Sequence, residues 1–198
     1  MEKVVISVKT GLNPRKNFQL NTQDAKNYYV TVKEMTSGKI VFSDRTDKIN
    51  DEAISIISNR SNLEFGDVLF SGIGTIGKIA IVDIPVNNWN VSESVFVIKP
   101  NINFIVAKFL MYVLGSNYIK NQYEGKSVGS TLKGVRMATL LAIEIPIPPI
   151  KVQKRIVAIL DKFDKLVCDI NEGLPAEINA RRKQYEYYRD KLLTFKEA

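Results

Sequence analysis

The chain has 198 residues, of which 45% are hydrophobic and 25% are charged, and it is long enough to bury one core and carry an appendage. It contains no histidine, which excludes the commonest general base and the commonest transition-metal ligand, and its single cysteine excludes an internal disulfide. The net charge of +7 favours a polyanionic partner and leaves ribosomal, membrane-surface and merely basic proteins as alternatives.

Residues 1–148 are predicted to form a mixed, strand-rich α+β domain. Short β-branched runs are separated by Gly, Asn, Asp and Pro, which is typical of strands and turns. Apolar spacing predicts a weak helix over Asp51–Ile57 and a clear one over Phe104–Ser116. The expected strands are Lys3–Val8, Tyr28–Val32, Lys39–Phe42, Val68–Ser71, Ile79–Val82 and Val95–Ile98.

Three glycines follow the fourth of these strands. Gly72, Gly74 and Gly77 have the G-x-G-x-x-G spacing of a dinucleotide site. However, the β-branched run Ile79–Val82 comes next, so no helix N-terminus is available to hold a pyrophosphate. We therefore interpret the glycines as the turn of a β-hairpin.

The only tryptophan, Trp89, lies among three asparagines in an expected loop over residues 87–90. Asparagine side chains can read base edges, and an aromatic ring can stack on a base or wedge between base pairs. Alternatively, Trp89 fills the core and the asparagines shape a turn. The sequence leaves both interpretations open.

A loop over residues 124–136 combines small residues, hydroxyls and cations. Residues 99–136 hold six basic residues and one acid, a local balance of +5. Such a loop can bring backbone N–H groups, hydroxyls and cations to phosphates, although a solvated flexible loop has a similar composition. By contrast, the carboxylate pairs Asp44/Asp47 and Asp51/Glu52 lie among turn residues, so we expect no catalysis and no metal site.

A heptad seam begins after Pro149 and is interrupted at residues 173–175. Its first part has spacings of 4, 3, 4, 3 and 4 residues, and the Gly-Leu-Pro break suits the end of one helix and the start of another. The sequence thus predicts a long coiled-coil-type helical arm over residues 149–198. Its seam consists of Ile156, Leu160, Phe163, Val167, Ile170, Leu174, Ile178, Arg181, Tyr185, Tyr188, Leu192 and Phe195.

The length of the arm decides what it is expected to contact. About 45 helical residues would span roughly 65 Å, whereas a domain of this size is only roughly 30 Å across. The arm must therefore pair with another chain or fold back as a hairpin at Gly173. We expect pairing with another chain.

Two stretches resemble the specificity subunits of type I restriction-modification systems. Residues 143–161, with the sequence IEIPIPPIKVQKRIVAILD, resemble the segment that follows a target recognition domain. Residues 173–195 are similar to the conserved spacer helix of that family, and Gly66–Leu69 with the glycines after it matches the recognition domain. The resemblance covers essentially the whole chain.

This resemblance implies a non-catalytic, sequence-specific DNA-binding subunit. Family members usually carry two recognition domains and two spacer helices, whereas this chain has one of each, so it resembles a half subunit that a two-fold homodimer would complete. The implied partners are double-stranded DNA, a methyltransferase subunit that uses S-adenosylmethionine, and a restriction subunit that uses ATP and Mg²⁺. This chain is expected to bind none of these cofactors and to lie in the cytoplasm, and no membrane span or signal peptide is expected.

The residues expected to contact DNA share positive charge, hydroxyls or base-reading amides. They are Lys9, Arg15, Lys16, Lys33, Lys78, Asn88, Trp89, Asn90, Lys126, Ser127, Thr131, Lys133 and Arg136. The expected dimer or partner interface consists of the seam residues without Arg181. The alternative function is a scaffolding protein whose arm dimerises without a role at DNA.

Overall fold

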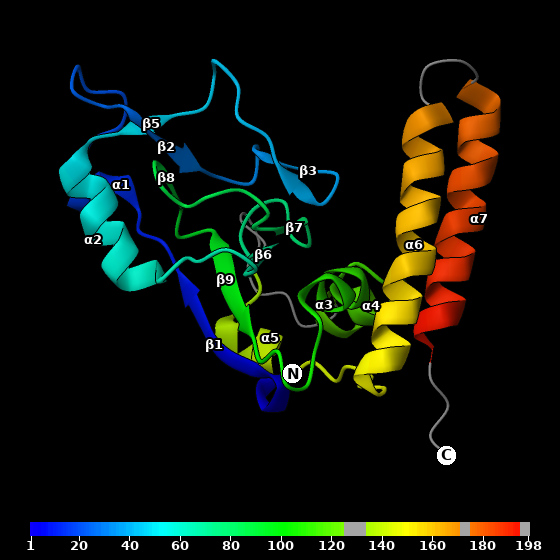
Figure 1. Ribbon diagram of the computed structural model, residues 1–198. Coiled ribbons are helices and arrows are strands. Elements are labelled where there is room, and N and C mark those ends of the chain that lie inside the picture. The colour runs from blue at the N-terminus through cyan, green and yellow to red at the C-terminus, as the bar shows by residue number, and fades with distance from the viewer. Residues whose placement is uncertain (125–133, 171–174, 195–198) are drawn as a thin grey trace.

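The computed structural model describes residues 1–124, 134–170 and 175–194, and Figure 1 shows a strand-rich part beside a pair of long helices. All six expected strands are present: β6 (Val68–Ser71) has the expected bounds, β9 (Val95–Pro100) extends further, β1 (Val5–Thr10) is shifted towards the C-terminus, and the other three are shorter. Several other short elements were not anticipated, because a segment of two to eight residues leaves little periodicity to detect. The unanticipated elements are the 3-10 helix η1 (Glu2–Val4), α1 (Pro14–Asn17), β3 (Met35–Thr36), β5 (Lys48–Ile49), β8 (Trp89–Val91), α4 (Asn117–Glu124) and α5 (Met137–Leu141).

A four-stranded antiparallel sheet forms the centre of the strand-rich part. Its order is β1 (Val5–Thr10), β9 (Val95–Pro100), β6 (Val68–Ser71) and β7 (Ile79–Ile81). Alternate residues of β6 and β9 enter two different hydrophobic clusters, one on each face of the sheet. Burial on both faces explains why these two strands have almost continuous apolar sequences.

Smaller β-elements lie against this sheet. A three-stranded sheet has the order β5, β2 (Asn27–Val30) and β8, with β2 and β8 parallel. The two-stranded hairpin of β3 and β4 (Lys39–Ile40) turns at Gly38, whose φ is 78°, and Gly38 pairs with Ala80 of β7. Asn50 caps α2 (Asp51–Ser61), because its side chain accepts a hydrogen bond from the Ala53 amide.

The C-terminal helices lie side by side. The helix α6 (Ile150–Ile170) and the helix α7 (Pro175–Leu193) run in opposite directions (Figure 1), and the rings of Phe163 and Tyr188 stack between them with centroids 6.0 Å apart. Within the described residues the two helices therefore fold back on each other and form no extended arm, and pairing with another chain stays a prediction. Among these residues, no helix is long and apolar enough to cross a membrane.

The first half of the seam is buried by its own chain. Ile156 is 5% exposed and Leu160 is fully buried, and both belong to the cluster that contains one face of the central sheet and α3 (Ala107–Leu114). At 21 residues, α6 is about 32 Å long, which matches the width of the domain. Folding back removes the length mismatch that favoured another chain. Ile156 and Leu160 are thus core residues, and their assignment to a dimer interface is corrected.

Gln153 fastens the start of α6 to the start of α3. Its side chain is fully buried, and its Oε1 accepts a hydrogen bond of 2.8 Å from the Val106 amide. Its Nε2 donates to the carbonyl oxygens of Phe104 and Pro148 at 2.9 and 2.8 Å. One buried amide therefore satisfies three backbone groups where the two parts of the chain meet.

Candidate nucleic-acid interface

Strand register places several of the predicted site residues at one end of the central sheet. Thr10, Phe96, Phe70 and Ile79 form one row across the four strands. The segments beyond this row are α1 after β1, the turn between β6 and β7, and the residues that lead into β9. This end of the sheet, which we call the hairpin end, is about 14 Å wide, since adjacent strands lie about 4.8 Å apart.

The turn between β6 and β7 is a tightly bonded hairpin. The Ser71 amide donates to the Lys78 carbonyl oxygen at 2.8 Å, and the Gly77 amide donates to the Ser71 carbonyl oxygen at 3.0 Å. The Ser71 hydroxyl donates to the Thr75 carbonyl oxygen and accepts from the Lys78 amide, at 2.6 and 2.8 Å. The interpretation of the glycines as a hairpin turn is confirmed, and no helix begins here to bind a dinucleotide.

The local environment differs among the three glycines of this turn. A Cβ on Gly72 would lie 2.1 Å from the Phe96 ring, and one on Gly77 would lie 2.2 Å from the Tyr123 hydroxyl. Gly74 has a φ of 78° but open space where a Cβ would stand. The tip of the hairpin is therefore a hydrogen-bonded loop with little side-chain bulk, which is suited to close approach of another molecule. Its exposed members Ile73 and Thr75 were not among the expected contacts, although they lie between the glycines that marked this loop.

The basic loop meets this hairpin. The Val135 amide donates to the Gly72 carbonyl oxygen at 2.8 Å, and Ile73 and Gly134 form a β-bridge. Arg136 follows directly and is exposed. Two motifs about 60 residues apart in sequence are thus brought together. The expected contacts Lys126, Ser127, Thr131 and Lys133 lie outside the described residues.

Two further cations stand beside the hairpin. Lys78 Nζ donates to the Val32 carbonyl oxygen at 3.0 Å, which ties the hairpin to the segment after β2. Lys33 follows Val32 and is exposed. Lys78 and Lys33 therefore lie close to each other at the hairpin end, as cations that contact neighbouring phosphates would have to do.

The N-terminal candidates lie at the opposite edge of the same end. Asn13 caps α1 by accepting from the Arg15 amide at 3.0 Å, and the Arg15 side chain is exposed. Lys9 is half-buried on β1, paired with Val97 of β9. The backbone of Lys16 is in α1, and its side chain lies outside the described residues.

The structure favours the core interpretation of the tryptophan. Trp89 is 1% exposed and its Nε1 donates to the Pro85 carbonyl oxygen at 2.8 Å. Asn90 is 1% exposed and binds Ser61, Ser58 and the Val91 amide. These side chains cannot reach DNA on this fold, so their assignment as DNA contacts is corrected. Asn88 is exposed, but it precedes β8 at the end of that strand away from the hairpin end.

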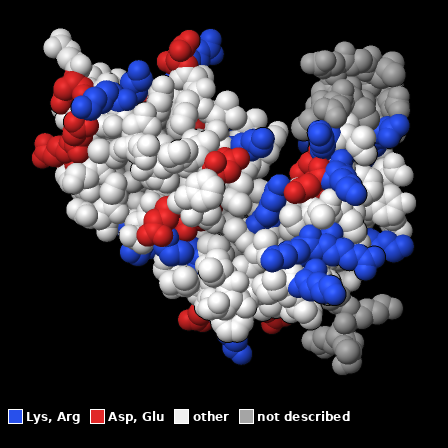
Figure 2. Space-filling model, in the orientation of Figure 1, with Lys and Arg blue, Asp and Glu red and all other residues white. Residues whose placement is uncertain are grey.

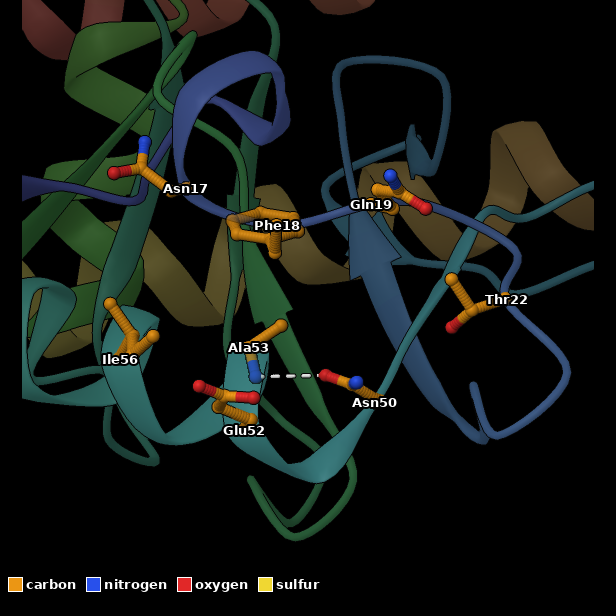
Figure 3. Close-up of a pocket in the computed structure, with 8 residues that line it drawn as sticks. All are labelled: Asn17, Phe18, Gln19, Thr22, Asn50, Glu52, Ala53 and Ile56. Atoms are coloured by element: carbon orange, nitrogen blue, oxygen red, sulfur yellow. Dashed lines mark hydrogen bonds between the residues drawn. The ribbon is translucent and has the colours of Figure 1, made fainter.

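A polar hollow lies elsewhere, between α1 and the start of α2 (Figure 3). Its lining includes the ring of Phe18, the amides of Asn17, Gln19 and Asn50, and the Glu52 carboxylate. Asp51 adjoins it, and hydrogen bonds from Lys26 and Asn27 lower the pKa of its carboxyl group, so the carboxylate stays charged at neutral pH. Negative charge at this hollow disfavours phosphate, so it is not part of the candidate interface.

Surface charge differs between the two sides of the molecule. On the face in view, Figure 2 shows Lys and Arg gathered over the helical pair and the helices beside it, whereas acidic residues are more frequent around α2 and β5. Among the described residues, no group of three or more Cys, Asp or Glu is placed to hold a metal ion. The exposed cations at the hairpin end can bind a polyanion.

The remaining seam residues have mixed positions. Phe163, Val167, Tyr185 and Leu192 are partly buried, and Tyr188 is 38% exposed. Leu174 and Phe195 lie outside the described residues, and only the backbone of Ile170 and Ile178 is described. The partly exposed members are the part of the expected interface that remains accessible.

Comparison with known proteins gives one consistent result. Residues 4–180 match the family model described as the type I restriction modification DNA specificity domain. The chain is 32% identical over 170 residues to the EcoR124I/EcoR124II specificity subunit of Escherichia coli, covering 84% of this chain and 41% of that protein. It is 38% identical over 130 residues to a putative type I restriction enzyme specificity subunit of Haemophilus influenzae, covering 66% of this chain and 32% of that protein.

Solved structures show the same fold. The S subunit of a type I restriction-modification system from M. genitalium matches with a TM-score of 0.56 and 18% identity, over 86% of this chain and 39% of that one. The HsdS subunit from Thermoanaerobacter tengcongensis matches with a TM-score of 0.57 and 23% identity, over 86% of this chain and 42% of that one. The chain spans less than half the length of these relatives.

Proposed function

Because the chain belongs to the family of type I restriction-modification DNA specificity domains, we propose that it binds DNA sequence-specifically and reads one half-site for a restriction-modification complex. The chain supplies recognition and assembly, and it has no catalytic activity of its own. The scaffolding alternative receives no support from the comparisons.

The observation that carries this proposal is the meeting of two motifs at the hairpin end. One end of the central sheet carries the hydrogen-bonded glycine turn, the segment Gly134–Arg136 and the cations Lys33 and Lys78. Cations at this end neutralise phosphates and set the register on the duplex. The exposed side chains of Ile73 and Thr75 then reach the base edges, where an apolar group can contact a thymine methyl and a hydroxyl can bond to either base of a pair.

The partners follow from the family and not from the geometry. We propose that a methyltransferase subunit, which uses S-adenosylmethionine, and a restriction subunit, which uses ATP and Mg²⁺, bind this chain. One solved relative that matches at a TM-score of 0.59 is described in terms of complex assembly of a type I restriction-modification system. The chain itself binds none of these cofactors.

A two-fold pair of chains would present two half-sites. Since Ile156 and Leu160 are buried by their own chain, self-pairing in this conformation has to use the outer face of the helical pair. The exposed apolar or aromatic side chains of these helices include Leu166 of α6, which is 49% exposed, and Tyr187 and Tyr188 of α7, which are 61% and 38% exposed. Sedimentation of wild type and of Leu166→Asp tests this, and a wild type that sediments as a monomer would rule out self-pairing.

Selection of DNA sequences by the purified chain together with its methyltransferase partner tests the function. We expect enrichment of one short motif. Lys78→Ala should weaken binding to all sequences and reduce the slope of affinity against salt by about one phosphate contact. Lys3→Ala is the control, because Lys3 is exposed at the opposite end of β1 and its loss changes the net charge equally. Recovery of random sequence would refute the proposal.

A further inference from the structure

Four polar side chains meet where α3 packs on α6. Tyr112 Oη lies 2.6 Å from Asp161 Oδ1 and 2.7 Å from Asp164 Oδ2. Lys108 Nζ lies 2.8 Å from Asp161 Oδ2. Lys108 and Tyr112 are one turn apart on α3, as Asp161 and Asp164 are on α6, so each pair faces the other helix. We call these four residues the clasp. Hydrogen bonds to charged groups are shorter and stronger than neutral ones, so the clasp joins the two helices in a defined orientation.

The second arm helix also reaches the clasp. Burial, the charge of Asp164 and a hydrogen bond to Asp164 raise the pKa of the Tyr185 phenol, which belongs to α7. Burial and the bonds to both carboxylates likewise raise the pKa of Tyr112. One polar cluster therefore holds α3, α6 and α7 in a fixed arrangement.

The number of hydrogens that Tyr112 can donate determines how substitutions in the clasp act. A phenol has one O–H, so at any moment it donates to Asp161 or to Asp164 but not fully to both. Lys108 compensates the charge of Asp161. An amide at position 164 would supply the missing hydrogen for the second contact, whereas loss of the Tyr112 hydroxyl would remove both contacts and leave the ring in place.

Gln153 provides a second attachment between the same two helices. It lies eight residues before Asp161, which is about 12 Å along α6. The hydrophobic effect is non-directional, so apolar burial defines the angle between two helices less sharply than hydrogen bonds do. Two directional attachments at this separation fix both the position and the angle of α6 on α3.

We propose that Tyr112 is a positioning residue, which through the clasp fixes the angle between the helical pair and the recognition sheet and thereby the base-pair spacing at which two half-sites are bound. The spacing part rests on the proposed function, whereas the angular part concerns this chain alone. Tyr112 is 5% exposed and its hydroxyl bonds Asp161 and Asp164, so its role is not contact with DNA.

The angular part is tested by pulsed electron spin resonance on the full chain. Nitroxide labels at Asn59→Cys on α2 and Lys165→Cys on α6, with Cys168→Ser, report the distance between the sheet side and the helical pair. Tyr112→Phe should broaden the distance distribution, and Asp164→Asn should leave it as narrow as in the wild type. Tyr29→Phe is the matched control, because it removes a phenol that is 3% exposed and donates to the Leu12 carbonyl oxygen at 2.6 Å, away from the clasp.

A distribution for Tyr112→Phe no broader than that for Tyr29→Phe would overturn the positioning role. If Tyr112→Phe fails to fold, Lys108→Met provides the test, since it removes the ammonium but keeps an unbranched apolar chain at a partly exposed position of α3. The distance distribution of Lys108→Met is then compared with that of Tyr29→Phe, and a distribution no broader than that of Tyr29→Phe again refutes the positioning role.

The spacing part is tested with duplexes that carry two inverted copies of the selected half-site, separated by spacers that change one base pair at a time. Losing a hydrogen bond to a charged group should reduce the preference for the optimal spacer by about tenfold in Tyr112→Phe, with affinity for a single half-site unchanged. An unchanged spacer preference would refute this part. Failure to select any half-site would refute the proposed function instead, and the spin-label distances would still decide the angular part.

Discussion

Replacing Gln153 with alanine tests whether the helical pair and the strand-rich part share one core. The Gln153 side chain is fully buried, and its removal leaves the part-buried Val106 amide and Phe104 and Pro148 carbonyl oxygens without this partner. A buried unsatisfied group costs about 1–3 kcal/mol, so the three together should lower the free energy of unfolding by about 3–5 kcal/mol, allowing for some access of water. This is a large share of the roughly 5–15 kcal/mol that stabilises a typical domain.

Two spectroscopic signals distinguish the parts of the chain during urea unfolding. Fluorescence of Trp89, the only tryptophan, reports the strand-rich part, and far-ultraviolet circular dichroism is dominated by the helices. We expect the two transitions to coincide in the wild type and to move together to lower urea in Gln153→Ala.

A matched control is available in Gln122→Ala. Gln122 bonds both backbone groups of Glu144 at 3.0 Å, but these bonds are solvent-exposed. Water can replace them, so this change should cost less than about 1 kcal/mol. If Gln153→Ala is no more costly than Gln122→Ala, or if only the dichroism transition moves, the shared core is refuted.

Three further predictions follow from burial and backbone geometry. Leu160→Ala should lower the free energy of unfolding by about 2–5 kcal/mol at any protein concentration, because Leu160 is fully buried in its own chain, and a concentration-dependent loss would instead indicate an intermolecular contact. Gly72→Ala should destabilise the protein more than Gly74→Ala in thermal melts, since only at Gly72 would the new Cβ strike the Phe96 ring, and equal losses would refute the packing argument. The pKa of Tyr112 is raised in the folded state, so the unfolded chain loses this proton first and the free energy of unfolding should fall above about pH 10. The fall should be less steep in Tyr112→Phe. Equal slopes of the two proteins in denaturant titrations at several alkaline pH values would contradict this.

The sequence predicted the central sheet well because its strands are buried on both faces. Val68–Ser71 and Val95–Ile98 are apolar in almost every position, and such a run reads as a strand wherever it lies in the fold. The three-residue strand β8 could not be recognised in the same way, because two of its flanking asparagines indicate a turn. The burial of Trp89 therefore became visible only with the pairing of β8 to β2.

The helical seam illustrates a different limit. A stripe of apolar residues shows that one face of a helix is covered, but it does not show whether the cover comes from the same chain or from another. Here α3 covers Ile156 and Leu160, and α7 lies alongside α6. The sequence could not predict the composition of the hairpin end for a similar reason. The hydrogen bond between Val135 and Gly72 joins residues that are distant in sequence.

The positions of the clasp and the hairpin end suggest how recognition and assembly are coupled. Strand β9 begins at the hairpin end and leads, through the loop that binds Gln153, into α3 and the clasp. Both faces of β9 are packed, so it cannot shift without disturbing two clusters. In addition, Glu186 and Arg189 of α7 line a hollow together with Ile76 and Gly77 of the hairpin. Substitutions at the exposed tip of the hairpin should therefore change which bases are read, whereas substitutions in β9 should change the angle of the helices as well.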